Sequence, residues 1–364
     1  MMYKDIVLPK NVKLSNRIFY LDFLKAFAIF LVAVGHVSSQ TLLFSPFNFN
    51  WVVADVYSTI AKISIPIFMM ISGVLLFNRD YDYVGFIKKR YPRILIPVIF
   101  WLVMYVILGF TFGWVEGKTP GTSILSIGKF IFLMFLGHAG YLTHFWYVWL
   151  ILSAYLIIPI INKWIKNSSF SEVKYFLILW LITCAFTTFK LPYVNIDIRY
   201  FAGPLGYFIL GYYLHNSTNK WWDRTWIWWI VLILSTALKV LITYHYSVLA
   251  GSFSGVDYYD LTTVAEAFSL FLIFRNMNFD GGVFSTFKKG KNASNVLSLS
   301  IFTFGIYLSH LLLFKYLLLR HVDFAGMFAL VSIPVFSVIL LVVAWFTMIV
   351  LSKIPVLKKF TGGA

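Results

Sequence analysis

Three ionisable residues interrupt a long apolar run near the start of the chain. The run is RIFYLDFLKAFAIFLVAVGHVSSQ, Arg17–Gln40, and the three residues are Asp22, Lys25 and His36. At about 100° per residue, Lys25 and His36 fall nearly in line on one helical face, about 16 Å apart along the axis, with Asp22 about one turn before Lys25. An acid, a cation and an imidazole on one face can hold charge and exchange protons, as in an active site or a transport path.

A structural interpretation of these residues is also open. Asp22 and Lys25 could form an ion pair at the helix end, and His36 could bond to a carbonyl of a neighbouring helix. That interpretation accounts for Asp22 and Lys25 but leaves the alignment of His36 unexplained. Because ionisable groups within a membrane span are costly and must face protein or water, we favour a functional site.

The second apolar run carries a lysine near its middle and a motif suited to close helix packing. At that depth Lys62 needs either a partner or an anionic ligand, and Asp55, near the same helical face, could be the partner. Both interpretations stay open. The run continues through FMMISG, Phe68–Gly73, where the small pair Ser72-Gly73 permits close approach of another helix.

A cluster of basic residues, Lys88, Lys89, Arg90 and Arg93, leads into the third apolar run. Clusters of this kind commonly fix the orientation of a span. Arg93, however, lies inside the apolar run, where orientation does not require a charge. Since guanidinium binds phosphate through paired hydrogen bonds, the cluster could also hold a phosphate-rich ligand beside a cavity. The sequence leaves these two interpretations equal.

Later spans contain further polar and aromatic residues. Glu266 falls in one apolar run, and Tyr307 and His310 fall in another, GIYLSHLLL. A lone histidine in a span commonly bonds to a facing helix, which is the simplest expectation for His310. Trp146 and Tyr147 fit an aromatic belt at the membrane interface, although sugar-binding sites also use aromatic platforms.

The composition predicts a membrane protein built from helices. Hydrophobic residues make up 60% of the chain and charged residues 12%, and apolar runs recur along its whole length. We expect an all-α, polytopic transmembrane helical bundle in which residues 1–364 form one integral membrane domain. The sequence predicts about ten spans, at about 18–38, 52–77, 93–113, 145–164, 173–190, 199–215, 224–246, 260–276, 297–319 and 326–351.

The distribution of charge predicts the orientation of these spans. The net charge is +16, and Lys and Arg gather in alternate loops, which by the positive-inside rule places both termini in the cytoplasm. Because no soluble domain displays a basic face, the charge does not indicate a nucleic-acid partner. The single cysteine, Cys184, excludes an internal disulfide, and no motif indicates a metal. We expect a multi-pass protein in contact with lipid in the cell membrane, most simply a bacterial plasma membrane.

Taken together, these motifs resemble those of the acyltransferase-3 family of integral membrane proteins. The family's first span carries a basic residue, ten intervening residues and a histidine, matched here by Lys25 and His36. Its next motif, two phenylalanines, two variable residues and Ser-Gly, corresponds to Phe68–Gly73, with Met69 in place of the second phenylalanine. The further landmarks are KKRYPRILIP, FWYVWLILSAYLIIPII, GYFILGYYL and GIYLSHLLL, in the family's order. The resemblance covers almost the whole chain.

The resemblance implies an O-acyltransferase that moves an acyl group, usually acetyl, from cytoplasmic acyl-coenzyme A to a hydroxyl of an extracytoplasmic glycan or its lipid-linked precursor. It implies His36 as the catalytic base, with Asp22 either steadying Lys25 or helping to orient the site. Coenzyme A would meet residues near the cytoplasmic ends of the first three spans: Lys25, Ser72, Lys89, Arg90 and Arg93. We expect the acceptor among Lys62, Trp146, Tyr147, Glu266, Tyr307 and His310. No metal is expected.

Some relatives append an extracytoplasmic esterase-like domain that receives the acyl group. This chain ends at Ala364 without one, so we expect direct transfer to the acceptor. Acetyl is preferred over succinyl on family grounds, while the acceptor glycan and the oligomeric state are left open.

A transporter that exports a small acid or flips a glycan is the main alternative. Intramembrane Lys25, Lys62, Glu266 and His310 would suit a transport path as readily as an acyl-transfer site. Against it, the sequence shows no inverted repeat and no pair of spans broken by glycine or proline. A membrane scaffold without chemistry would leave the aligned Asp22, Lys25 and His36 unexplained.

Overall fold

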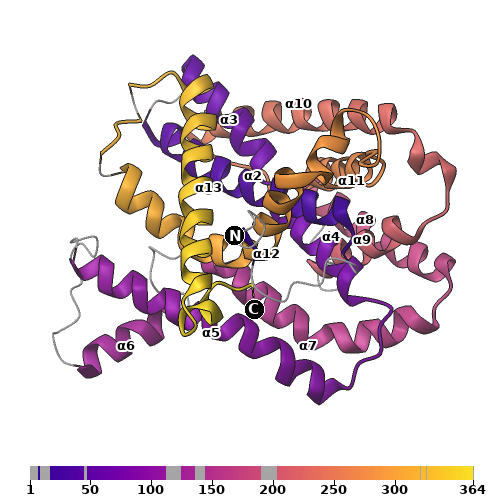
Figure 1. Cartoon of the computed structure of the whole chain (residues 1–364). Helices are drawn as coiled ribbons and strands as arrows, with labels where there is room; N and C mark the ends of the chain where they lie inside the picture. Colours follow the sequence, from indigo (N-terminus) through magenta and orange to yellow (C-terminus); the bar gives the residue numbers. More distant parts are fainter. Residues whose placement is uncertain are drawn as a thin grey trace.

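The computed structural model describes residues 7–8, 17–44, 47–111, 124–135, 144–189, 203–319, 321–324 and 326–363. All regular structure within these ranges is helical, which confirms the predicted all-α class (Figure 1). The α-helices are α2 (Phe19–Phe44), α3 (Phe49–Ala61), α4 (Ser64–Leu76), α5 (Tyr83–Thr111), α6 (Ile124–Phe135), α7 (Trp146–Asn167), α8 (Phe170–Phe189), α9 (Leu205–Asn216), α10 (Thr225–Ala250), α11 (Leu261–Arg275), α12 (Gly290–Leu313) and α13 (Ala329–Lys353). Short helical turns are η3 (Lys220–Asp223), η4 (Val283–Lys288), η5 (Phe314–Leu319) and η6 (Leu357–Phe360).

Seven helical segments of the described chain are long and apolar enough to cross a membrane. They are Phe19–Leu43, Phe49–Leu76, Tyr83–Leu108, Trp146–Asn167, Thr225–Ala250, Gly290–Leu319 and Ala329–Lys353. Helices α8, α9 and α11 occupy the other three predicted positions, and α9 and α11 have only 12 and 15 residues. The polytopic bundle is therefore confirmed, whereas the count of ten spans stays a prediction.

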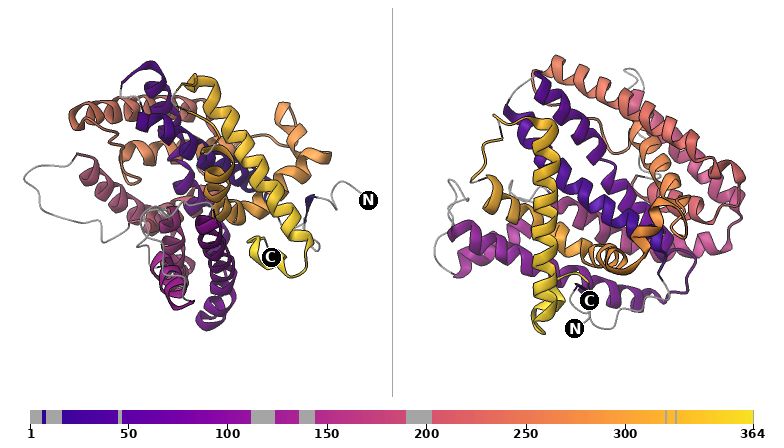
Figure 2. Two further views of the ribbon diagram at one scale, coloured as in Figure 1. Left: turned by 90° about the vertical axis from the view of Figure 1, so that its left-hand side faces the viewer. Right: turned by 45° about the horizontal axis from the view of Figure 1, so that its top comes forward.

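Helix α2 lies inside the bundle and packs against α3, α4, α11, α12 and α13 (Figure 1). Its side chains Leu24, Ala28, Ile29 and Val37 are buried between these neighbours. Helices α10 and α13, whose apolar spans are the least buried, lie at the periphery (Figure 2). This arrangement shields the polar face of α2 from lipid, so that its ionisable residues meet protein or a cavity.

The second predicted span consists of two helices, α3 and α4, joined at Lys62 and Ile63. The N–H groups of both residues still donate to carbonyl oxygens of α3, so the junction is a tight turn and not an open loop. Pro66 lies in the first turn of α4, where the missing N–H of proline removes no intrahelical hydrogen bond. The junction places Lys62 at a helix end, where its side chain can reach a neighbouring segment.

Glycine residues allow α4 and α9 to pack backbone against backbone. A Cβ atom added at Gly73 would lie 1.8 Å from the carbonyl oxygen of Phe208, and one added at Gly211 would lie 2.2 Å from that of Met70. Small residues commonly permit such contacts between membrane helices. The close approach predicted for Ser72-Gly73 is therefore confirmed, and it fixes the position of the Phe68–Gly73 motif.

The two described ends of the chain lie at one end of the bundle. The carbonyl oxygen of Val7 accepts a hydrogen bond from Ser298 at 2.6 Å, and that of Leu8 accepts one from Lys353 at 3.3 Å. At the other terminus, Phe360 stacks on Phe100 of α5 with ring centroids 4.2 Å apart. The placement of both termini in the cytoplasm stays a prediction from charge.

Candidate active site

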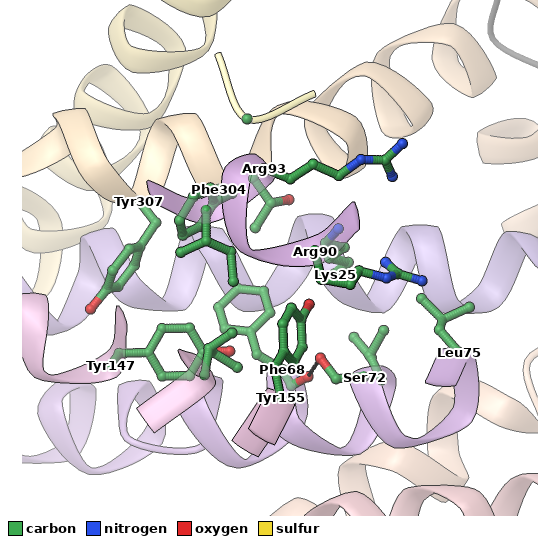
Figure 3. Close-up of a pocket in the computed structure, with 15 residues that line it drawn as sticks. Lys25, Phe68, Ser72, Leu75, Arg90, Arg93, Tyr147, Tyr155, Phe304 and Tyr307 are labelled. Atoms are coloured by element: carbon green, nitrogen blue, oxygen red, sulfur yellow. Dashed lines mark hydrogen bonds between the residues drawn. The ribbon is translucent and has the colours of Figure 1, made fainter. Parts of the chain in front are cut away.

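A cavity of about 270 Å³ opens between α2, α4, α5, α7 and α12, and we name it the Lys25 cavity (Figure 3). It brings together four of the five residues expected to bind coenzyme A: Lys25, Ser72, Arg90 and Arg93. The fifth, Lys89, is exposed and does not line it. Its other lining residues are Phe68, Ile71, Leu75, Ile94, Tyr147, Ile151, Tyr155, Thr303, Phe304, Tyr307 and Gly362.

The Lys25 cavity is electropositive at one end. Figure 3 shows Lys25, Arg90 and Arg93 on one side and the rings of Tyr147 and Tyr307 on the other. No carboxylate lines the cavity, and none of the three cations forms a salt bridge with another residue of the described ranges. Cations without a carboxylate partner, followed by an apolar wall, suit a ligand with a phosphate head and a neutral arm.

A second cavity of about 300 Å³, the His36 cavity, lies farther along α2. It brings His36 together with three of the residues expected to meet the acceptor, Lys62, Trp146 and Tyr307, and with His144 and Tyr258, for which the sequence suggested no role. The remaining lining residues are Leu31, Val32, Gly35, Ser39, Ser58, Ala61, Ser64 and Ile65.

Tyr307 of α12 is the one described residue that lines both cavities. Its hydroxyl donates to the backbone carbonyl of His144, and its ring lies against Tyr147 with centroids 5.3 Å apart. The side chain is buried, with a relative exposure of 4%. Tyr307 therefore forms part of the wall between the cation-lined cavity and the histidine-lined cavity.

Two further aromatic residues, Trp146 and Tyr258, line the His36 cavity. The rings of Trp146 and Tyr258 lie 5.2 Å apart between centroids. Tyr258 belongs to the segment between α10 and α11, where burial and, to a smaller extent, the Asp257 carboxylate raise its pKa above the ordinary value. Its phenol therefore stays protonated and can donate a hydrogen bond to a polar ligand.

Three imidazoles meet beside the His36 cavity. The ring centroid of His36 lies 4.9 Å from that of His310 and 6.5 Å from that of His144, and His144 and His310 are 5.5 Å apart. His144 and His310 are almost completely buried, whereas His36 is half-buried. The described residues contain no group of His, Cys, Asp or Glu arranged to hold a metal ion, this cluster included.

Asp22 is held away from His36. Its carboxylate accepts hydrogen bonds from Arg17, one of them 2.9 Å long, and from the Ser300 hydroxyl at 2.5 Å. Asp22 lies fourteen positions before His36 on the helix, which corresponds to about 21 Å along the axis. Because Asp22 has Arg17 as its partner, the geometry gives it a structural role at the start of α2 and does not bring it to the imidazole.

Glu266, expected among the acceptor residues, also has a structural partner. It forms a fully buried ion pair with Lys239, Oε2 to Nζ 2.7 Å, and accepts a hydrogen bond of 2.9 Å from Thr236. Lys239 donates in addition to the carbonyl oxygen of Thr59 at 3.3 Å. This network joins α10, α11 and α3, and Glu266 lines neither cavity.

Lys62 does not pair with Asp55 as one interpretation suggested. Its Nζ donates to the carbonyl oxygen of Val256 at 2.7 Å and lies 5.8 Å from the centre of the Phe253 ring. Asp55 instead accepts from Thr59 at 3.4 Å, and its Oδ2 has no hydrogen-bond partner in the described structure. Lys62 thus fastens the segment after α10 to the edge of the His36 cavity.

No pattern in the sequence indicated a role for His144 or Tyr258. Neither belongs to a spaced motif, and their contacts with His36 and Trp146 join segments more than 100 residues apart. Tertiary packing brings these two residues to one cavity with His36, His144 from the turn before α7 and Tyr258 from the segment between α10 and α11.

Comparison with family models supplies an independent result. A model described as an acyltransferase domain, that of the acyltransferase-3 family, matches residues 18–352. Searches among curated proteins and among solved structures find no match. The matched region includes every residue that lines the two cavities except Gly362. It also includes all the sequence motifs on which the resemblance rests. Since the match covers nearly the entire chain, this protein belongs to the acyltransferase-3 family and is a multi-pass membrane acyltransferase.

Proposed function

We propose that the protein moves an acetyl group from cytoplasmic acetyl-coenzyme A to a hydroxyl of a cell-envelope or exported glycan, or of its lipid-linked precursor. The donor occupies the Lys25 cavity and the acceptor the His36 cavity. The observation that carries this proposal is the presence of two cavities that share Tyr307, one with three cations and the other with an accessible imidazole.

The donor assignment is supported by charge and shape. Lys25, Arg90 and Arg93 would bind the phosphates of coenzyme A, because charge-assisted hydrogen bonds to phosphate are the strong ones. The apolar wall that includes Phe68 and Ile151 would hold the pantetheine arm. This pose directs the thioester toward Tyr307 and therefore toward the His36 cavity.

The acceptor assignment is supported by the lining of the His36 cavity. Trp146 and Tyr258 offer an aromatic platform for the apolar face of a sugar, and the hydroxyls of Ser39, Ser58 and Ser64 offer hydrogen bonds to its polar edge. Pockets of this kind bind ligands through a mainly apolar surface with a few placed polar groups.

His36 acts as the general base in this proposal. Its neutral imidazole takes the proton of the acceptor hydroxyl as the oxygen attacks the carbonyl carbon of the thioester. The new C–O bond forms, the C–S bond breaks, and His36 returns the proton to the departing thiolate. The products are an acetyl ester and free coenzyme A.

The experiment is to incubate the purified full chain in lipid nanodiscs with acetyl-coenzyme A and a panel of envelope glycans. Thiol release measures donor consumption, and mass spectrometry detects an acetyl ester on the acceptor. Comparison of envelope glycans from cells with and without the protein identifies the acceptor. Release of thiol together with an acetylated glycan supports the proposal, whereas glycan or acid transport without thiol release contradicts it.

A further inference from the structure

The buried imidazole of His310 has one ring nitrogen engaged and one without a partner. Its Nδ1 lies 2.6 Å from the carbonyl oxygen of Tyr307. Because a carbonyl can only accept, Nδ1 must carry the hydrogen, and Nε2 of the neutral ring is then a bare acceptor. That Nε2 is buried and has no hydrogen-bond partner in the described structure. Because buried acceptors are rarely left unpaired, we expect a neighbouring group to donate a hydrogen bond to this nitrogen.

His36 is the neighbour best placed to supply the donor. Its ring centroid lies 4.9 Å from that of His310, closer than the 5.5 Å between His144 and His310. The Nε2 of His144 lies 3.4 Å from the Tyr105 hydroxyl, whose oxygen accepts from the N–H of Leu312 at 2.9 Å, while its Nδ1 is also without a partner in the described structure. His144 is therefore the second possible donor, but its ring lies farther from that of His310 than the ring of His36 does. The two close rings are therefore His36 and His310.

The two rings differ in their access to a substrate. His36 lines the cavity and is half-buried, whereas His310 is 2% exposed and lines neither cavity. A hydroxyl in the His36 cavity can thus reach His36 but not His310. His310 can therefore influence the reaction only indirectly, and the ring of His36 is the nearest imidazole through which it can act.

We propose that His310 is a positioning residue for His36, an inference that rests on the proposed acetyl transfer. In the reacting complex, one ring N–H of His36 donates to Nε2 of His310, and this hydrogen bond fixes the tautomer and the orientation of His36. The other nitrogen of His36 is then bare and directed into the cavity. It takes the hydroxyl proton as the C–O bond forms, and the resulting imidazolium gives that proton to the thiolate as the C–S bond breaks. His310 accepts a hydrogen bond throughout and ends the cycle unchanged.

Two substitutions separate this role from a role in packing. His310→Asn keeps an N–H near the position of Nδ1 for the Tyr307 carbonyl and removes the acceptor at Nε2. His310→Gln places an amide oxygen near the position of Nε2 and so restores the acceptor. His245→Asn is the matched control, because His245 is exposed on α10 and lines neither cavity.

The experiment measures kcat and KM for acetyl-coenzyme A with the full chain in nanodiscs and an acceptor glycan identified by mass spectrometry. We expect His310→Asn to lower kcat by about 100-fold while KM changes less than about 2-fold, and His310→Gln to recover about 10-fold of that loss. His245→Asn should match the wild type. A His310→Asn enzyme with wild-type kcat, or a His310→Gln enzyme no better than His310→Asn, overturns the proposal.

A double substitution tests whether His310 acts through His36. Because both residues belong to one unit, adding His310→Asn to His36→Gln should leave the residual rate unchanged within about 2-fold. A further 100-fold loss in the double variant would show an independent role and contradict the inference. A wild type without turnover refutes the acetyl transfer itself, whereas an active wild type matched by an active His310→Asn refutes only the role of His310.

Discussion

Lys25 and His36 lie on one helix about 16 Å apart along its axis, yet they line different cavities. The separation divides the site into a cation-lined part and an imidazole-lined part, with Tyr307 between them. A donor with its charge at one end and its reactive group at the other could span this distance. The spacing of Lys25 and His36 on α2 therefore suits an acyltransferase, which must hold a donor and an acceptor at neighbouring sites.

Removing a cation from the Lys25 cavity should weaken donor binding. We expect Lys25→Met and Arg93→Met each to raise KM for acetyl-coenzyme A about 10-fold, because a charge-assisted hydrogen bond contributes about 1.5–3 kcal/mol. The value of kcat should change less than about 2-fold, since neither group reaches the reacting atoms. Initial rates of thiol release over a range of donor concentrations measure both constants.

Lys88→Met is the control for these two variants. Lys88 belongs to the same basic segment but is exposed and lies outside the lining of either cavity. Its loss should leave KM unchanged. Equal effects of Lys88→Met and Arg93→Met would mean that general surface charge, and not the cavity, attracts the donor.

Replacing Tyr307 by alanine should uncouple donor consumption from acetylation. The truncation removes the wall common to both cavities, so water from one cavity can reach a thioester in the other. We expect thiol release to exceed acetyl ester formation by about 10-fold or more in Tyr307→Ala. The ratio of the two products, measured in one reaction, reports the coupling.

Tyr307→Phe tests whether the ring or the hydroxyl maintains that coupling. The variant keeps the ring that lies against Tyr147 and loses the hydrogen bond to the His144 carbonyl. If the ring is the barrier, Tyr307→Phe should release thiol and form ester in nearly equal amounts. Full coupling in Tyr307→Ala would contradict a barrier at this residue.

Breaking the buried pair between Lys239 and Glu266 should lower stability and leave the chemistry intact. Loss of one partner strands a buried charge, which costs about 3–5 kcal/mol, so Glu266→Gln should lower the unfolding temperature clearly. Turnover per folded molecule should stay near the wild-type value because Glu266 lines neither cavity.

The matched control for Glu266→Gln is Asp280→Asn. Asp280 pairs with Lys288 at 2.6 Å on an exposed surface, where an ion pair contributes about 1 kcal/mol or less. The unfolding temperature should therefore change little. A raised acceptor KM in Glu266→Gln, without loss of stability, would instead support the acceptor-binding role expected from the sequence.

The sequence predicted the class of fold, and four of the five residues expected to meet one ligand, Lys25, Ser72, Arg90 and Arg93, line one cavity. Of the residues expected to meet the acceptor, Tyr147 lines the Lys25 cavity instead, and His310 lines neither cavity. Apolar runs of membrane length identified the helices because a bilayer demands them, and the small pair Ser72-Gly73 correctly indicated a close helix contact. Lys25 and His36 were found because two polar residues on one face of an apolar helix are rare.

Residues whose roles depend on distant partners could not be assigned in the same way. The pattern placed Asp22 beside Lys25, but Arg17 and Ser300 hold its carboxylate. The sequence placed Glu266 among the residues expected to meet the acceptor, but its carboxylate pairs with Lys239 of α10. Tertiary packing decides which of several possible partners a side chain contacts. The spacing of residues along one helix does not encode that packing.

The role of His36 as the base is tested by measuring acetyl transfer and donor binding in parallel for His36→Gln, with His245→Gln as control. We expect kcat to fall by at least about 100-fold, with acetyl-coenzyme A still raising the unfolding temperature as in the wild type. Wild-type turnover in His36→Gln, or loss of donor binding together with activity, would contradict a base at this position.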